Sequence, residues 1–256
     1  MQLSILVCAL HSRDWLKVVR KLYRQCSTYP NEVELCVSTD SGSITSGVKR
    51  QQLINQSCGE YVAFVDDDDD VSHKYISTLL ASINTGRDVI TFNLDMHLEG
   101  QLHQRQSLSL HNKDGQSLPL AVTGMTANHL CAWRREVASM VAWCPALGYG
   151  DDQLWYKPLV LAMPGLTEQH CDETLYVYNH RRDGTANQVK DRKLKARLLY
   201  GSGCGVYRKD GAIYLETRTA GTMNGRMVTV RDRENDIHHV NRNLWQQYKL
   251  GLARVV

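Results

Sequence analysis

The chain has 256 residues, of which 43% are hydrophobic and 22% charged, and its formal net charge is +3. This composition argues against an intrinsically disordered chain and allows a sizeable core, in one domain or in a domain with an appendage. The eight cysteines form no C-x-x-C pair, and several lie in apolar stretches. They therefore indicate packed, reduced thiols and argue against a zinc or disulfide framework.

The first apolar run, residues 3–10, is followed directly by His11, Arg13 and Asp14 and is much shorter than a membrane span. It also lacks a basic leader, so it has the features of a strand and not those of a signal peptide. We therefore expect a cytoplasmic protein without a transmembrane segment.

The charges are unevenly distributed along the chain. Residues 181–256 hold 16 Lys and Arg against 7 Asp and Glu, whereas residues 1–180 hold 14 against 20. A basic segment of this kind binds an anionic partner such as nucleic acid or lipid headgroups, or docks as a solvated surface on the acidic body. The sequence favours neither alternative.

Strand-like and helix-like segments alternate along the first 95 residues. Short apolar runs predict strands, and apolar residues spaced three and four apart predict amphipathic helices. The predicted strands cover residues 2–10, 33–38, 60–65 and 88–95, and the predicted helices cover 15–25, 48–58 and 73–83. This order is typical of an α/β protein with a parallel sheet, in which ligands bind at the carboxyl ends of the strands.

Elements are also predicted in the C-terminal third. Residues 190–200 predict a basic amphipathic helix, 211–221 and 225–232 a hairpin-like pair of strands, and 237–252 a closing helix. No G-x-G-x-x-G or Walker phosphate loop occurs anywhere in the sequence. An ordinary dinucleotide site or P-loop site is therefore not expected.

Polar segments follow the first three predicted strands: HSRD at 11–14, TDSGS at 39–43, and five consecutive Asp at 66–70. Carboxylates repel one another and resist leaving water, so five together at the end of a buried strand require a cationic partner. Mg²⁺ and Mn²⁺ suit such a site, because they are hard ions that prefer oxygen ligands and keep positions open for substrate phosphates.

The acidic run has two other interpretations. A calcium loop of the helix-loop-helix type needs Gly at its sixth position and Glu at its twelfth, but the chain has Val71 and Ser77 there. That interpretation fails. The second is a solvated acidic turn that caps a helix beginning near Ser72, since anions favour a helix N-terminus.

The stretch at 33–76, VELCVSTDSGSITSGVKRQQLINQSCGEYVAFVDDDDDVSHKYI, resembles the nucleotide-sugar-binding half of family 2 glycosyltransferases of the GT-A fold. The shared pattern is a strand, Asp-x-Gly-Ser, a helix with Lys or Arg, Gly-Glu-Tyr, an apolar strand and Asp-x-Asp. A weaker likeness extends over residues 149–185.

The resemblance implies a GT-A (Rossmann-like) α/β fold with a mostly parallel sheet flanked by helices. It divides the chain into a core at 1–189, with a nucleotide-sugar-binding half at 1–95 and an acceptor half at 96–189, and a basic C-terminal extension at 190–256 that would contact the acceptor.

The resemblance also implies which residues bind the donor. Asp40 would hydrogen-bond the nucleobase, with a local Asx-turn as the alternative role. Lys49 and Arg50 would lie near the diphosphate, with a solvated helix face as the alternative. Ser12 and Arg13, after the first strand, are further candidates for the same pocket.

The metal ligands follow from the same comparison. Asp66 and Asp68 correspond to the Asp-x-Asp pair, and Asp67 between them would lie near the sugar or ribose. The metal, Mn²⁺ or Mg²⁺, would bridge the two donor phosphates and neutralise the charge of the leaving group. His180, after the Tyr-x-Tyr strand, would complete the metal shell.

The candidate catalytic base lies in PALGYGDDQLWYKPL, which resembles the family's acidic pair at the start of a helix. Asp151 or Asp152 would deprotonate the attacking hydroxyl of the acceptor, and Asp152 is preferred because the second acid of that pair has this role in the family. The alternative is that both residues serve as a helix N-cap.

Three hypotheses for the function follow. The first is a metal-dependent, inverting glycosyltransferase, a hexosyl- or pentosyltransferase that uses a nucleotide-diphosphate sugar, with UDP-sugars favoured. Its acceptor would be a hydroxymethylated base in DNA, which the basic tail suits, or a surface polysaccharide or lipid-linked glycan. The second is a nucleotidyltransferase, which would usually carry a Gly-rich loop after the first strand. The third is a nucleic-acid-binding module that keeps a GT-A-like fold without catalysis.

Overall fold

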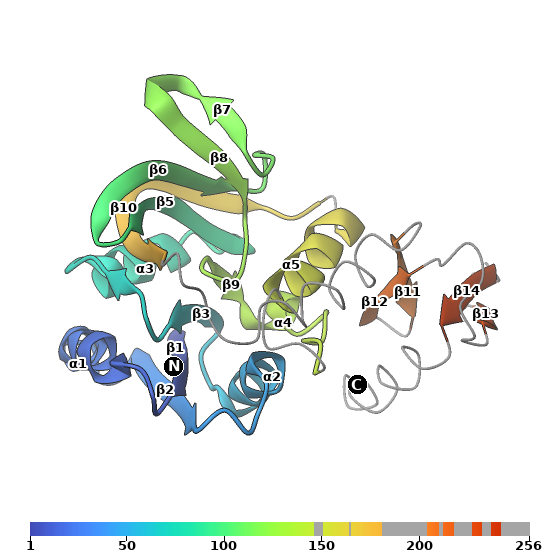
Figure 1. Ribbon diagram of the computed structural model, residues 1–256, viewed down its shortest axis with the longest axis horizontal. Helices are drawn as coiled ribbons and strands as arrows, with labels where there is room; N and C mark the ends of the chain where they lie inside the picture. Colours follow the sequence, from blue (N-terminus) through green and yellow to red (C-terminus); the bar gives the residue numbers. More distant parts are fainter. Residues whose placement is uncertain are drawn as a thin grey trace. The chain divides into compact units, whose positions relative to one another are not determined.

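A computed structural model describes residues 1–145, 151–163 and 165–180, together with the backbone of four strands between 204 and 241 (Figure 1). The chain divides into two compact units. Unit 1 comprises Met1–Ile44, Gln52–Ala138 and Gly165–Gly184, and unit 2 comprises Thr45–Gln51, Ser139–Pro164 and Thr185–Val256. The predicted division at residues 95 and 189 stays a prediction.

The first three strands are parallel neighbours, as the sequence predicted. β1 (Leu3–Leu10) lies between β2 (Val33–Asp40) and β3 (Tyr61–Asp66) and pairs in parallel with both. The strands are apolar because both faces of a parallel sheet are covered. Ile5, Leu6 and Val65, for example, are buried.

The strand predicted at 88–95 is present as β5 (Val89–Leu98), but it does not pair with β3. A three-residue strand, β9 (Ala132–Arg134), lies between β3 and β5 and is antiparallel to both. The sequence did not predict β9, because three residues are too few for a periodic signal. Its Trp133 is buried in the core and donates its indole N–H to the carbonyl of Asn128 at 2.8 Å.

The far side of the sheet is built from further strands, of which the sequence predicted only the one that carries the Tyr-x-Tyr segment. β6 (Gln101–Ser109) is antiparallel to β5, β8 (Val122–Thr126) is parallel to β6, and β7 (Gln116–Leu118) is antiparallel to β8. β10 (Glu168–His180) runs parallel to β5 and also pairs with the two-residue strand β4 (Asp70–Val71). The ladders β1–β2, β1–β3 and β5–β10 are long and parallel, so the sheet is mixed but mostly parallel.

Helices flank this sheet. α1 (Trp15–Cys26) buries Val18 and Leu22, one helical turn apart, and packs against β1, β2 and α3 (Tyr75–Ile83). The remaining helices are α2 (Ser46–Gln56), α4 (Arg135–Ala138), α5 (Asp151–Ala162) and a short 3-10 turn at Pro119–Ala121. The predicted helices 15–25, 48–58 and 73–83 are thus confirmed as α1, α2 and α3, and the α/β class is confirmed with them.

The described C-terminal strands differ from the prediction. β12 (Ala212–Thr217) pairs with β11 (Cys204–Lys209), and β13 (Met227–Arg231) pairs with β14 (Ile237–Asn241), so the strands predicted at 211–221 and 225–232 have other partners. Residues 237–241 form a strand, and the prediction that a helix begins there was wrong. Val240 and Ile237 are β-branched, and β-branched residues favour strands. The helix predicted at 190–200 lies outside the described residues.

The part of the chain that the structure describes contains no helix long and apolar enough to cross a bilayer.

The close approach of Gly59 to β1 gives a test of the fold. A Cβ atom at Gly59 would lie 2.6 Å from the backbone nitrogen of Ser4 and 2.8 Å from the carbonyl carbon of Leu3, which is too close for either backbone to accept. We expect Gly59→Ala to lower the free energy of unfolding by about 1–3 kcal/mol through overpacking. Gly165→Ala is the matched control, because open space surrounds Gly165. Urea unfolding of both variants measures the difference, and equal stabilities would contradict the packing described.

Candidate functional site

The carboxyl ends of β1, β2 and β3 meet at one edge of the sheet in unit 1. The register places Leu10 opposite Asp40 and Cys8 opposite Asp66. The three polar segments predicted at the ends of these strands, at 11–14, 39–43 and 66–70, therefore lie side by side. This confirms that the three segments meet at one edge of the sheet, and ligand binding at that edge stays a prediction.

Asp40 organises the loop that follows it. Its Oδ2 accepts hydrogen bonds from the backbone N–H groups of Gly42 and Ile44, at 3.0 and 2.8 Å, and from the hydroxyl of Ser43 at 3.1 Å. Gly42 has a φ of +93°, a conformation that glycine adopts without strain. The structure thus contains the Asx-type turn considered for Asp40, and contact with a nucleobase stays a prediction.

The first three carboxylates of the acidic run have partners in the protein. Asp66 Oδ2 lies 3.3 Å from His129 Nε2. Asp67 is 2% exposed, accepts the backbone N–H of Leu10 at 2.8 Å and forms a close ion pair with the guanidinium of Arg13. The same Nη1 atom of Arg13 lies 3.2 Å from Asp68 Oδ2. Arg13, which the sequence suggested for the donor pocket, therefore pairs with two carboxylates of the acidic run.

The last two carboxylates face other elements. Asp69 accepts the hydroxyl hydrogen of Tyr176 at 2.8 Å and the backbone N–H of Asn179 at 2.7 Å, both from β10. Asp70 pairs with Lys21 of α1 at 2.8 Å. The five carboxylates thus diverge toward different partners, and the repulsion that the sequence predicted is offset in part by side chains of unit 1.

The pKa values of the acidic run reflect both the burial of its carboxylates and the repulsion between them. Burial raises the pKa of Asp68, and the carboxylates of Asp66 and Asp67 raise it further, although Arg13 opposes them. Burial also raises the pKa of Asp69 well above its usual range, with Asp66 and Asp68 adding to the shift. Burial lowers the pKa of Arg13, but Asp68 and Asp67 outweigh it and the net shift is upward. One guanidinium therefore does not fully compensate this cluster.

The residues at this edge fit a divalent cation in their donor chemistry. Asp66 and Asp68 are about one quarter exposed and offer the hard oxygen atoms that Mg²⁺ and Mn²⁺ prefer. Among the described residues, however, no group of three His, Cys, Asp or Glu side chains is arranged to hold a metal ion. Two carboxylates alone do not fill the shell of such an ion, which keeps positions open for substrate or water oxygens. The assignment of Asp66, Asp68 and His180 as metal ligands stays a prediction.

His180 is the last residue of β10 and its ring stacks on Tyr178, with centroids 6.3 Å apart. Its neighbour Asn179 binds the acidic run twice, through its backbone N–H to Asp69 and through Nδ2 to the carbonyl of Asp68 at 3.0 Å. The strand that carries His180 is therefore anchored to the predicted metal ligands. Ser12 is exposed in the loop that follows β1.

Unit 2 contains the other predicted site residues. Arg50 donates from Nη1 to both carboxylate oxygens of Asp151, at 3.0 and 2.9 Å, and its guanidinium lies 4.9 Å from the ring centre of Trp143. Trp143 stacks on Trp155 with ring centroids 4.9 Å apart. Lys49 and Arg50 are both buried, so the alternative of a solvated helix face was wrong.

The two adjacent acids differ in environment. Asp151, the first residue of α5, is 2% exposed and held by Arg50, whereas Asp152 is partly exposed. A buried, ion-paired carboxylate holds its geometry and accepts a proton from a substrate poorly. The arrangement therefore favours Asp152 over Asp151 as a candidate base, and catalysis by either residue stays a prediction.

Sequence reasoning missed several residues that contact the acidic run. Tyr176 accepts the backbone N–H of Asp66 at 3.0 Å while donating to Asp69, and it belongs to the Tyr-x-Tyr strand noted in the resemblance. That strand was the available signal. His129 lies in an irregular segment between β8 and β9, and Lys21 lies within an ordinary amphipathic helix. Nothing in the local sequence distinguishes those two.

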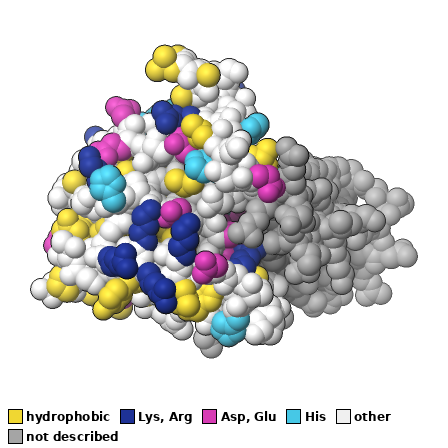
Figure 2. Space-filling model, turned by 60° about the vertical axis from the view of Figure 1, so that its left-hand side comes forward, with side chains coloured by type: hydrophobic (Ala, Val, Ile, Leu, Met, Phe, Trp, Pro, Cys, Tyr) yellow, Lys and Arg dark blue, Asp and Glu magenta, His cyan; other side chains and the backbone are white. Residues whose placement is uncertain are grey.

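Charge is gathered on the face shown in Figure 2, where Lys and Arg side chains lie beside Asp and Glu side chains. In sequence, α1 contains four basic residues and no acidic one. Lys21 is the member of this helix that reaches the acidic run. The basic helix thus complements the acidic segment that follows β3.

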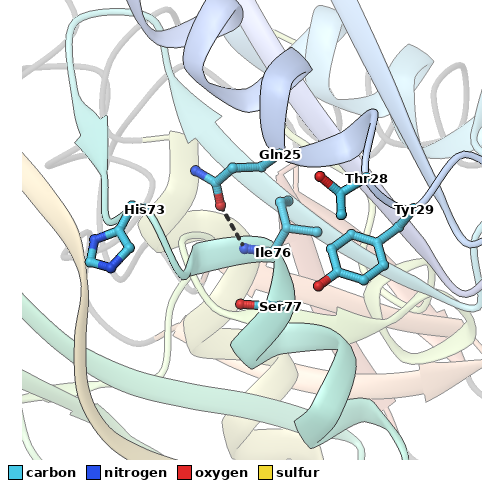
Figure 3. Close-up of a pocket in the computed structure, with 6 residues that line it drawn as sticks. All are labelled: Gln25, Thr28, Tyr29, His73, Ile76 and Ser77. Carbon is cyan, nitrogen blue, oxygen red and sulfur yellow. Dashed lines mark hydrogen bonds between the residues drawn. The ribbon is translucent and has the colours of Figure 1, made fainter.

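A small pocket of about 110 Å³ lies where the end of α1 meets the start of α3 (Figure 3). Gln25 donates to the carbonyl of Ser72 at 3.0 Å and accepts the backbone N–H of Ile76 at 3.1 Å. Gln25 thereby satisfies a backbone donor in the first turn of α3. The contacts of this pocket are structural, since they join two helices beside the acidic run.

A scan against models of protein families and a search of curated proteins find no match to this chain. Solved structures do match it. Residues 1–349 of TarS from S. aureus give a TM-score of 0.51 at 18% identity, covering 70% of this chain and 60% of that one. The same fragment in complex with UDP-GlcNAc gives 0.52 at 16% identity, with 74% and 61% covered, and in complex with UDP it gives 0.50 at 18%, with 70% and 61% covered.

This chain therefore spans about 60% of the length of the TarS fragment. At such low identity the likeness shows the fold, which is the GT-A-like glycosyltransferase fold. The fold implied by the resemblance is thus confirmed. Membership of family 2 stays a prediction.

The buried ion pair of unit 2 gives a stability test. Arg50→Leu leaves the buried carboxylate of Asp151 without its guanidinium, and we expect the free energy of unfolding to fall by about 3–5 kcal/mol. The double variant Arg50→Leu/Asp151→Leu should be less destabilised, because it removes both charges of the pair. Urea unfolding followed by tryptophan fluorescence compares the two. A double variant as unstable as the single one would rule out an unpaired charge as the cause.

Asp69 gives a pH-dependent test. The pKa of Asp69 is higher in the folded protein than in the unfolded chain, where it is about 3.9. As the pH rises above about 3.9, Asp69 ionises in the unfolded chain before it ionises in the folded protein. The folded state therefore loses stability relative to the unfolded chain until the pH reaches the folded pKa. Asp69→Asn keeps an acceptor for Asn179 and a partner for Tyr176 but does not ionise. We expect the variant to gain stability relative to the wild type as the pH rises from about 4 toward 8. Urea midpoints across this range test it, and a difference independent of pH would contradict the burial effect.

Proposed function

We propose that this protein is a glycosyltransferase that moves a sugar from a nucleotide-diphosphate sugar, with a UDP-sugar favoured, to a hydroxyl group of an acceptor. The observation that carries the proposal is the acidic run at the carboxyl edge of a GT-A-like sheet, in a fold shared with TarS in complex with UDP-GlcNAc. The order of motifs around Asp40 and the acidic run supports it independently.

In this proposal the donor binds at the edge formed by β1, β2 and β3. Asp40 contacts the nucleobase, and Asp66 and Asp68 hold Mn²⁺ or Mg²⁺, with His180 as a further ligand. The bound ion would neutralise the charge of the departing nucleoside diphosphate. Asp67 is engaged by Leu10 and Arg13, so it contributes by fixing that loop, whatever contact it makes with the ribose.

Asp152 is proposed as the general base that takes the proton of the attacking hydroxyl. In an inverting transfer the hydroxyl oxygen forms a bond to the anomeric carbon while the bond to the diphosphate oxygen breaks on the opposite face. Asp151 keeps the start of α5 in place through Arg50. The partly exposed position of Asp152 supports this division of roles.

The proposal has two alternative acceptors, and both carry hydroxyl groups. The excess of 16 Lys and Arg over 7 Asp and Glu in residues 181–256 favours an anionic acceptor, of which hydroxymethylated DNA is the first to test. A surface polysaccharide or lipid-linked glycan is the alternative acceptor.

Donor binding and transfer test the proposed function directly. Calorimetry with UDP-, GDP-, dTDP- and CMP-sugars, with and without Mn²⁺ or Mg²⁺, should give metal-dependent binding of one nucleotide sugar. Asp68→Ala should weaken that binding, because it removes a metal ligand. Asp152→Asn should leave binding intact and lower transfer by about 10²–10⁴-fold, the usual contribution of a general base.

Full transfer by both variants would refute the assigned roles. Absence of binding for every donor, combined with DNA binding that weakens steeply with salt, would instead favour a nucleic-acid-binding module on this fold.

A further inference from the structure

We propose that Arg13 is an internal counter-ion that occupies the acidic run in the absence of donor and must leave Asp68 before a divalent metal binds there. Metal and nucleotide would then bind together and only weakly apart. This inference rests on the proposed function. Arg13 would regulate metal binding at the same site.

The contacts of Arg13 are unequal. Its guanidinium forms a close ion pair with Asp67, whereas its distance to Asp68 Oδ2 is 3.2 Å. Asp67 is 2% exposed and is fixed by the backbone N–H of Leu10, while Asp68 is 28% exposed. Asp67 is therefore the anchor of the guanidinium, and Asp68 is the partner that it can release. The side chain of Arg13 is itself 26% exposed, which leaves it able to move.

A metal ion and the guanidinium compete for the same oxygen atoms. Arg13 lies within ion-pair distance of Asp68, one of the two predicted carboxylate ligands, so a cation placed there meets a like charge. The described residues also offer no group of three metal-binding side chains. An ion at Asp66 and Asp68 would have coordination positions left for other ligands, and the diphosphate oxygens of a bound donor suit them.

The same diphosphate accounts for the release of Arg13. A guanidinium binds phosphate oxygens through parallel N–H donors as well as it binds a carboxylate. Arg13 belongs to the loop that follows β1, at the edge where the donor is proposed to bind. When Arg13 leaves Asp68 and binds a phosphate group instead, its guanidinium keeps an anionic partner. The carboxylate of Asp68 is then available to the metal ion. This exchange couples the two binding events.

Binding of Mn²⁺, followed by electron paramagnetic resonance with and without UDP, tests the proposal. The wild type should bind Mn²⁺ weakly alone and more tightly with UDP. Arg13→Gln should bind Mn²⁺ alone about tenfold more tightly than the wild type, since one positive charge about 4 Å away is removed. UDP should then raise the Mn²⁺ affinity of the variant less than that of the wild type, because coupling is reciprocal.

Two further variants separate the release of Arg13 from a general change in charge. Lys21→Gln removes a cation that pairs with Asp70 in the same acidic run, and its Mn²⁺ affinity should stay within about twofold of the wild type because Asp70 is not a ligand. The double variant Arg13→Gln/Asp67→Asn has the same net charge as the wild type and leaves no unpaired carboxylate at position 67. It therefore tests the loss of Arg13 even where the single variant fails to fold. We expect this double variant also to bind Mn²⁺ more tightly than the wild type.

The proposal is overturned if Arg13→Gln and the double variant bind Mn²⁺ no better than the wild type, or if Lys21→Gln improves binding as much as Arg13→Gln. Failure of the proposed function has a different signature. In that case no nucleotide or nucleotide sugar binds the wild type with any metal, while the comparison of Mn²⁺ affinities without nucleotide still decides the role of Arg13.

Discussion

Unit 1 depends on the distribution of five adjacent carboxylates at the end of β3. Like charges this close would destabilise the folded state if they shared one environment, and the run instead finds partners in several elements. Arg13 comes from the loop after β1, Lys21 from α1, His129 from the segment before β9, and Tyr176 and Asn179 from β10. The acidic run therefore joins elements that its own repulsion would otherwise separate.

The course of β10 follows from the same requirement. Its pairing with β5 is interrupted by register shifts between Cys171 and Thr174 and between Thr174 and Tyr176, just before it reaches β4. Irregularities of this type bend a strand and redirect its side chains, and they are frequent near functional sites. Here they precede the residues that bind Asp66 and Asp69, so the irregular strand places a hydroxyl and an amide where the buried carboxylate needs them.

The sequence predicted what local patterns determine. The strands β1, β2, β3 and β5, the helices between them and the edge where their polar loops meet are all confirmed. β9 could not be predicted, because it is three residues long and is defined by two neighbours from distant parts of the chain. Nor could the partners of the acidic run, since Arg13 and Asp67 are 54 positions apart and Arg50 and Asp151 are 101 apart. A cluster of carboxylates in a sequence predicts that cations lie nearby in the fold. It does not predict which residue or ion supplies the positive charge.

The two acids at the start of α5 show how neighbouring residues of one type acquire different properties. Asp151 lies between a guanidinium and the core of unit 2, where Trp143 covers the other side of Arg50. Gly47 fits against this segment only because it lacks a side chain, since a Cβ atom there would lie 2.1 Å from the carbonyl oxygen of Cys144. The close approach of α2 brings Arg50 to Asp151 and fixes the first turn of α5. Asp152, one residue later, stays partly exposed to solvent, as the proposed role of general base requires.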